Sequence, residues 1–255
     1  MHKTVAITGA TGTLGKACVE RFCQTWRDEH EWHVHGCGRR QIADVIDNFD
    51  SMYLGEERLK YSPVDVTNLR HVGHWLDIVH NFCGLDALVT CAGVSLVGRS
   101  TMLAGEFGDC VDVNLNGSFY AAAAAVHYGA TRIVFIGSIH GCTPTSYPKR
   151  AAYTASKAGI AGLTRALAVE WAPRGVAVNC VAPGHLPALM DGTGAGQALL
   201  DAAKTRTPTG RLTTPDEVAD VVFWLCNDAP MSLTGQVITV DGGFTLNTWP
   251  MEGEP

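Results

Sequence analysis

The chain has 255 residues and a formal net charge of −6, and 46% of its residues are hydrophobic against 17% charged. This composition is typical of a globular protein with a large core; the acidic balance without a basic cluster argues against a nucleic-acid partner, and no apolar run is long enough to span a membrane. The nine cysteines are scattered without metal-ligand spacing, so we expect no metal site and a reducing, cytoplasmic location.

The first predicted strand, Thr4–Ile7, is followed by a glycine-rich turn and then by a predicted helix over Lys16–Trp26. The glycines would let the backbone turn tightly, approach a pyrophosphate and pack the helix on the strand. The helix N-terminus would offer N–H groups to phosphate. Because the turn lies between a strand and a helix, we favour a dinucleotide site over a plain tight turn. Its candidate cofactor-binding residues are Gly9, Thr11, Gly12, Thr13, Leu14 and Gly15.

The second predicted strand, Trp32–Cys37, ends in Gly38, Arg39 and Arg40. An acidic residue is expected about 20 residues after the glycines when a ribose 2′-hydroxyl is bound, and Gly38 lacks that carboxylate. The fork of donors on an arginine suits a phosphate, which favours NADP(H) over NAD(H). Alternatively, the two arginines are solvated residues that open the next predicted helix, Gln41–Phe49.

Two further predicted strands, Arg58–Val64 and Leu85–Thr90, lead into candidate cofactor contacts. Asp65 and Val66 follow the first of them. The carboxylate could accept a hydrogen bond from an adenine amino group, cap the helix that begins near Asn68, or do both. Small residues after the second strand would let a flat ligand lie against the backbone. These residues are Cys91, Ala92 and Gly93.

A proton-transfer site is predicted around the fifth strand, which includes Ile133–Ile136. Ser138 follows this strand, at the end of the sheet where open α/β sheets bind ligands. Tyr153 and Lys157 are four residues apart on the predicted helix Ala152–Trp171, so they share one face. The ammonium would favour the ionised phenol, which suits proton transfer to or from a carbonyl or alcohol oxygen. The alternative is an exposed helix face without chemistry.

The sixth predicted strand, Val176–Val181, leads into a loop that should face the substrate. We expect a mobile lid over 185–210, because the run Asp191–Gly196 is polar and rich in glycine. Histidines on these loops could bind a polar substrate or merely shape the loop. The candidate cofactor contacts here are Pro183, Gly184 and Leu186, and the candidate substrate contacts are His140, His185, Leu189 and Met190.

The remaining elements are a long helix over Glu106–Tyr128 that contains Asn114, a helix over Asp216–Cys226, a last strand over Gln236–Val240 and a tail at 245–255. An amide inside a helix is more often a packing residue than a catalytic one. The repeated alternation of strands and helices predicts an α/β fold: a Rossmann-like, doubly wound parallel sheet of about seven strands with helices on both faces, in a single domain over residues 1–255.

With these residues in order, the chain resembles the short-chain dehydrogenase/reductase family over nearly its whole length. The resemblance implies that Tyr153 is the acid/base and that Lys157 lowers its pKa and binds the nicotinamide ribose. It implies that Ser138 holds the substrate oxygen, and that Asn114 bends its helix and anchors a water linked to Lys157. It also implies hydride transfer with a nicotinamide cofactor, and homodimers or homotetramers formed through the two long helices and the last strand.

Three positions depart from the family pattern. Thr13 stands where typical members have a glycine, so the glycine spacing is that of the extended members. Cys91 replaces the usual asparagine before Ala-Gly, and Ala188 replaces a threonine that contacts the cofactor. The C-terminal motifs are nevertheless those of the typical members.

The leading hypothesis is an NADP(H)-dependent reductase of small-molecule ketones or aldehydes. The alternatives are a reductase of ketoacyl thioesters, a nucleotide-sugar epimerase, and a regulator that binds the cofactor without catalysis. The intact pair of Tyr153 and Lys157 argues against the regulator.

Overall fold

The fold is that of a computed structural model, which describes residues 2–24, 32–41, 43, 59–95, 104–143, 150–187 and 196–247. The helix predicted over Gln41–Phe49 lies mostly outside these residues, as do the run Asp191–Gly196 and most of the C-terminal tail.

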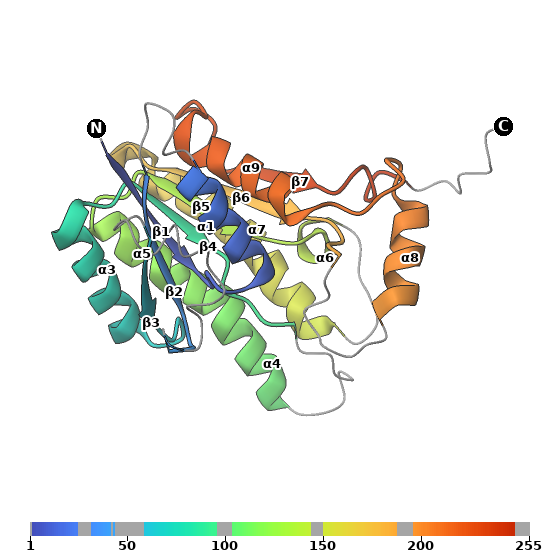
Figure 1. Ribbon diagram of the computed structural model, residues 1–255, viewed down its shortest axis with the longest axis horizontal. Helices are drawn as coiled ribbons and strands as arrows, with labels where there is room; N and C mark the ends of the chain where they lie inside the picture. Colours follow the sequence, from blue (N-terminus) through green and yellow to red (C-terminus); the bar gives the residue numbers. More distant parts are fainter. Residues whose placement is uncertain are drawn as a thin grey trace.

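Seven strands form one sheet in the order β3-β2-β1-β4-β5-β6-β7 (Figure 1). Every pairing between neighbouring strands is parallel. Each strand lies within two residues of its predicted bounds, so the doubly wound parallel sheet is confirmed. The strands are β1 (Lys3–Thr8), β2 (Trp32–Gly38), β3 (Leu59–Pro63), β4 (Ala87–Thr90), β5 (Arg132–Ile136), β6 (Ala177–Pro183) and β7 (Val237–Val240).

The strand order reverses between β1 and β4, and this is where an open α/β sheet forms its ligand crevice. The two strand ends are tied together at that point. Cys91 donates its backbone N–H to the Thr8 carbonyl at 3.1 Å, and the Ala92 N–H bonds the Thr8 hydroxyl at 3.1 Å. Gly9 has a φ of 65°, and a Cβ there would lie 2.5 Å from the Ala92 nitrogen, so only glycine fits this turn.

Helices cover both faces of the sheet (Figure 1). Helices α1 and α9 pack on one face, where Val5 and Ile7 of β1 point, and α3, α5 and α7 pack on the other, where Ala6 points. Because both faces are buried, the strands are continuously apolar rather than alternating. The helices are α1 (Thr13–Cys23), α3 (Leu69–Cys83), α4 (Ala104–Val111), α5 (Gly117–His127), α6 (Ile139–Cys142), α7 (Ala151–Trp171), α8 (Gly196–Arg206) and α9 (Pro215–Asn227), with a 3-10 turn at Ala172–Arg174.

Two helices differ from their predicted form. Helix α1 begins at Thr13 rather than Lys16, because Gly12 is already its N-cap residue. The long helix predicted over Glu106–Tyr128 consists of α4 and α5 joined by a π-helical turn, Asp112–Asn116. Such turns widen the helix by one residue and often mark functional sites.

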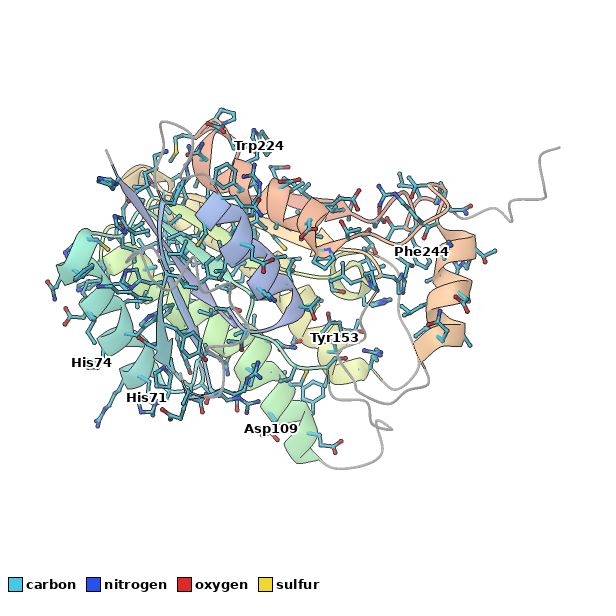
Figure 2. All side chains as sticks on the ribbon, viewed as in Figure 1. His71, His74, Asp109, Tyr153, Trp224 and Phe244 are labelled. Carbon is cyan, nitrogen blue, oxygen red and sulfur yellow. The ribbon has the colours of Figure 1, made fainter. Side chains whose placement is uncertain are left out.

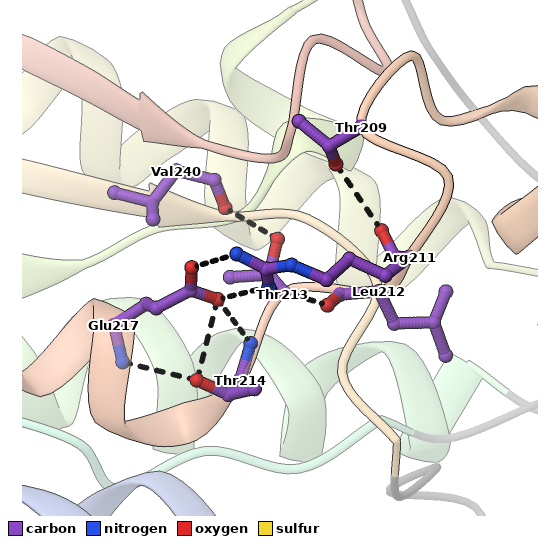
Figure 3. A network of polar contacts seen from close by, with 7 residues as sticks. All are labelled: Thr209, Arg211, Leu212, Thr213, Thr214, Glu217 and Val240. Atoms are coloured by element: carbon purple, nitrogen blue, oxygen red, sulfur yellow. Dashed lines mark hydrogen bonds and ion pairs between the residues drawn. The ribbon is translucent and has the colours of Figure 1, made fainter.

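A polar network fixes the start of α9 next to the loop after β6 (Figure 3). Thr214 and Glu217 form a capping box, and Arg211 binds the same carboxylate at 2.5 and 2.8 Å. Thr213 donates its N–H to the His185 carbonyl at 3.2 Å and its hydroxyl to the Val240 carbonyl at 3.1 Å. The network therefore connects the predicted substrate loop to the end of β7.

We expect Glu217→Gln to lower the Tm at neutral pH by roughly 2 °C, because the amide keeps the capping geometry but loses the charge that Arg211 and the Thr214 N–H bind. Hydrogen bonds from Arg211 and Thr214 lower the pKa of Glu217 to about 2. A carboxylate with a depressed pKa stabilises the folded state above its unfolded pKa of about 4.3 and loses that effect as the pH falls. The Tm difference from wild type should therefore narrow between about pH 4.5 and pH 2. Glu20→Gln, which removes an exposed pair with Lys16, is the control; a difference independent of pH would contradict the assignment.

Candidate functional site

A cleft of about 570 Å³ runs along the carboxyl ends of β1 to β6. It brings together residues that the sequence scatters over six strand ends. The predicted residues that line it are Gly9, Thr11, Gly12, Thr13, Leu14, Gly15, Arg39, Arg40, Asp65, Val66, Cys91, Ala92, Gly93, Ser138, His140, Tyr153, Lys157, Pro183, Gly184, His185 and Leu186. Asn114 is fully buried and does not line the cleft. Leu189 and Met190 lie outside the described residues.

The N-terminus of α1 opens into the cleft beside the glycine turn. Its N-cap residue, Gly12, makes no side-chain capping bond, and the first turn holds no acidic residue. The first N–H groups of an eleven-residue helix therefore face the cleft with a partial positive charge. This arrangement fits a dinucleotide diphosphate, and Thr13 at the first helical position is exposed and obstructs nothing.

Two arginines lie at the β2 end of the cleft, where Gly38 takes the place of the acidic residue that would bind a ribose 2′-hydroxyl. A Cβ at Gly38 would lie 2.8 Å from the Tyr61 hydroxyl oxygen, so an acidic side chain there would have to displace the phenol. Tyr61 donates its hydroxyl to the Arg40 carbonyl at 3.1 Å, and Arg40 donates to the Thr11 carbonyl at 3.3 Å. Tyr61 of β3, which the sequence analysis did not single out, therefore braces the loop that carries the two arginines.

Asp65 forms a local turn with Thr67 rather than a helix cap. Its carboxylate accepts from the Thr67 N–H at 3.0 Å and from the Thr67 hydroxyl at 2.8 Å. Burial acts to raise the pKa of Asp65, but these bonds and the nearby Arg39 outweigh it and lower the pKa. Asn68 caps α3, accepting from the N–H groups of residues 70 and 71, so the capping role considered for Asp65 was wrong.

The phenol and ammonium predicted for proton transfer lie on the first turns of α7, Tyr153 facing the cleft (Figure 2). Both side chains are buried, with 8% and 5% exposure. Lys157 places its Nζ 5.9 Å from the centre of the Tyr153 ring and donates to the Ile136 carbonyl at 2.8 Å. This bond ties α7 to the end of β5.

Ser138 is held against the same helix by α6, a short element that the sequence did not predict. The Ser138 hydroxyl accepts the His140 N–H at 3.2 Å and caps α6. A Cβ at Gly141 would lie 2.4 Å from the Ala158 nitrogen, so α6 packs backbone to backbone on α7. The hydroxyl, phenol and ammonium therefore occupy one rigid corner of the cleft.

Asn114 connects three segments around this corner. Its Oδ1 accepts the Val94 N–H at 2.8 Å, and its Nδ2 donates to the Val94 carbonyl at 2.9 Å and to the Ser156 hydroxyl at 3.0 Å. Ser156 in turn donates to the Tyr153 carbonyl at 2.8 Å. The amide therefore fixes the segment after β4 and the first turn of α7. The helix that contains Asn114 is interrupted at this residue by the π-helical turn.

The far wall of the cleft carries two histidines and an arginine. The rings of His140 and His185 lie 5.4 Å apart, and His185 also packs on Phe244 at 4.6 Å. Burial lowers the pKa of His185, and Arg206 and Arg150 lower it further, which favours the neutral imidazole. Arg150 was missed as a site residue; it is the N-cap residue of α7, three residues before Tyr153, and lines the same cleft.

No helix in the described part of the chain is long and apolar enough to cross a membrane. The same residues contain no cluster of three side chains suited to a metal ion.

The sequence comparisons agree on one family. A family model described as enoyl-(acyl carrier protein) reductase matches residues 14–245. The chain is 33% identical to 3-oxoacyl-[acyl-carrier-protein] reductase FabG of Thermotoga maritima, covering 96% of this chain and 98% of that protein. It is 30% identical to 3beta-hydroxysteroid dehydrogenase 1 of Eggerthella lenta, covering 96% and 94%. The short-chain type dehydrogenase/reductase y4vI of Sinorhizobium fredii is longer: at 30% identity, the match covers 95% of this chain and 43% of y4vI.

Solved structures share the fold over nearly the whole chain. The crystal structure of gox2181 superposes with a TM-score of 0.86 at 32% identity, covering 96% of each chain. A tyrosine-to-phenylalanine variant of ElxO with NADPH bound superposes with a TM-score of 0.83 at 29% identity, covering 96% of this chain and 99% of that one.

We expect Asn114→Ala to lower the free energy of unfolding by about 3 kcal/mol, because the polar groups of Val94 lose their partners. Urea unfolding measures this change. Asn116→Ala is the matched control from the same π-helical turn: Asn116 makes an exposed bond to Asp112, and its loss should cost less than about 0.5 kcal/mol. Equal losses in the two variants would contradict the connecting role of Asn114.

Proposed function

Because this chain belongs to the short-chain dehydrogenase/reductase family and is thus an NAD(P)-dependent oxidoreductase, we propose that it uses NADPH to reduce a small ketone or aldehyde to the alcohol. The observation that carries this proposal is the placement of Tyr153, Lys157 and Ser138 in one corner of the cleft. A phenol beside an ammonium and a hydroxyl is suited to moving a proton at a carbonyl oxygen.

The bound cofactor would supply the hydride that the carbonyl carbon accepts. Ser138 donates a hydrogen bond that orients the carbonyl oxygen, and Tyr153 gives this oxygen its proton, so that hydride and proton together yield the alcohol. Lys157 keeps a positive charge beside the ring and favours the phenolate that remains. A proton from solvent then restores the phenol. Asn114 acts through Ser156 and Val94, and it positions the corner rather than touching substrate.

The residues around Gly38 support NADP(H) over NAD(H). The Tyr61 hydroxyl fills the space in which a carboxylate would bind a ribose 2′-hydroxyl. Arg39 and Arg40 are exposed at the same end of the cleft, and Arg40 is anchored to Thr11. We assign the 2′-phosphate to Arg39, and the adenine amino group to Asp65.

A ketoacyl thioester is the second candidate substrate. It is favoured by the description of the matching family model and by the relative that is an acyl-carrier-protein reductase. The carrier protein would require a recruiting basic surface, and the net charge of −6 argues against one.

The assembly, the lid and the location extend the same proposal. An apolar depression between α5 and α7 includes Leu115, Leu163 and Phe119, which is 39% exposed; it supports a homodimer or homotetramer formed through these helices. Leu199 of α8 lines the cleft, which supports a substrate lid within residues 185–210 of a single domain. All nine cysteines are free thiols, which supports a reducing, cytoplasmic location.

We expect Tyr153→Phe to lower kcat by roughly 10²- to 10⁴-fold, because the proton donor is lost. NADPH affinity, measured by cofactor fluorescence, should stay within a few-fold of wild type. Tyr128→Phe is the control, since Tyr128 ends α5 and contacts His80 and His127 away from the cleft. Residual activity near the wild-type level would contradict the role of Tyr153. Tight NADPH binding without turnover of any carbonyl compound by the wild type would favour the non-catalytic regulator.

We expect Arg39→Asp to weaken NADPH binding by roughly 10- to 100-fold, because a charge-assisted contact to the 2′-phosphate is lost. NADH binding should change by less than about threefold, so the preference moves toward NAD(H). Dissociation constants for both cofactors measure this shift. An unchanged ratio in Arg39→Asp, together with a shifted ratio in Arg40→Gln, would assign the phosphate to Arg40.

A further inference from the structure

Arg150 lies at the substrate end of the cleft, immediately before α7. Its carbonyl accepts the Thr154 N–H at 2.8 Å, which begins the helix, and Tyr153 follows three residues later. The side chain lines the cleft and donates Nη1 to the hydroxyl of Ser95, which is 7% exposed. A guanidinium is therefore held within the cleft, three residues before the proposed proton donor.

The partner of this guanidinium is itself fixed. Ser95 follows Val94, whose N–H and carbonyl are both bound by the buried amide of Asn114. Nη1 of the guanidinium is thus bonded to a segment that Asn114 fixes through two hydrogen bonds to Val94. A cation held in this way loses little conformational freedom on binding an anion, which strengthens the interaction.

The described charged residues that line the substrate end of the cleft are positive. Lys157 lines the same end of the cleft. Burial is the main cause that lowers the pKa of His185, and the charges of Arg206 and Arg150 lower it further. Among the described lining residues the only carboxylate is Asp65, which lies at the adenosine end beside Arg39. Asp241 is near His185 but does not line the cleft; its oxygens accept from the N–H groups of residues 243 and 245 and the hydroxyl of residue 245.

From this arrangement we infer that the substrate carries a carboxylate and that Arg150 binds it. The enzyme then acts on small oxo acids and the corresponding hydroxy acids rather than on neutral ketones; this inference rests on the proposed carbonyl reduction. Arg150 is the N-cap residue of α7, Tyr153 follows three residues later, and both side chains line the same cleft. We therefore expect a carboxylate on Arg150 and a carbonyl oxygen at Tyr153 to be separated by only a few bonds. The planar fork of donors on arginine matches a carboxylate in geometry as well as in charge.

The test compares each oxo acid with its neutral methyl ester: 2-oxobutanoate, 3-oxobutanoate and 4-oxopentanoate, with NADPH as reductant. We expect the wild type to favour an acid over its ester by roughly 10- to 100-fold in kcat/KM. Arg150→Gln should remove this preference by lowering kcat/KM for the acid, with the ester within about threefold of wild type. Arg150→Lys keeps the charge and should retain part of the preference. The control is Arg70→Gln, an exposed residue at the start of α3. Figure 2 shows its neighbour His71 well away from Tyr153.

A binding measurement complements the kinetics. Butanoate has a carboxylate but no carbonyl group, so it can occupy the substrate end without reacting. Titrated into the protein with NADPH bound, it should change the cofactor fluorescence in the wild type, and at least tenfold more weakly in Arg150→Gln.

Each outcome decides the inference. Equal kcat/KM for acids and esters in the wild type would overturn it, and this comparison needs no variant. An equal loss on both substrate types in Arg150→Gln would make Arg150 a purely structural brace. If no acid, ester or other carbonyl compound is reduced, the proposed function fails, and butanoate binding then decides the carboxylate site alone: binding that depends on Arg150 supports it, and no binding overturns it.

Discussion

The buried amide of Asn114 is the interaction on which the geometry of the cleft depends. It lies in a π-helical turn and bonds both polar groups of Val94, which is twenty residues earlier in the chain. Through Ser156 it reaches the turn that carries Tyr153, and through the neighbour of Val94 it reaches Arg150. One side chain thus positions both the proposed proton donor and the proposed substrate anchor. A buried amide with every polar atom bonded is rigid because any displacement would leave a group unsatisfied in a medium of low dielectric constant.

The parallel sheet supplies the second constraint. Its helices cover both faces, so the central strands are buried and closely packed, and loops from different strands meet at the two edges where the strands end. The reversal of strand order between β1 and β4 opens the crevice at the carboxyl edge. The loops that follow different strands therefore lie close together at this edge. This is why a cleft of about 570 Å³ is lined by residues from six strand ends.

The features that the sequence predicted are those encoded locally. The glycine turn, the strand ends and the pair of Tyr153 and Lys157 depend on spacings of a few residues, which the periodicity of strands and helices converts into shared edges and faces. The missed features depend on pairing between distant segments. Tyr61 meets Gly38 only because β2 and β3 pair in one register, and α6 is only four residues long. Arg150 was visible as a charged residue, but its place in the cleft depends on Ser95, 55 residues away.

The contact between Tyr61 and Gly38 also restricts how this protein could evolve. An acidic side chain at position 38 would displace a hydroxyl that holds the Arg40 carbonyl, in a residue that is only 9% exposed. A single replacement there would disturb the arginine loop before it could help bind a different nucleotide. An acidic residue at position 38 would require the Tyr61 phenol to move, so the packing between neighbouring strands couples changes at these two positions.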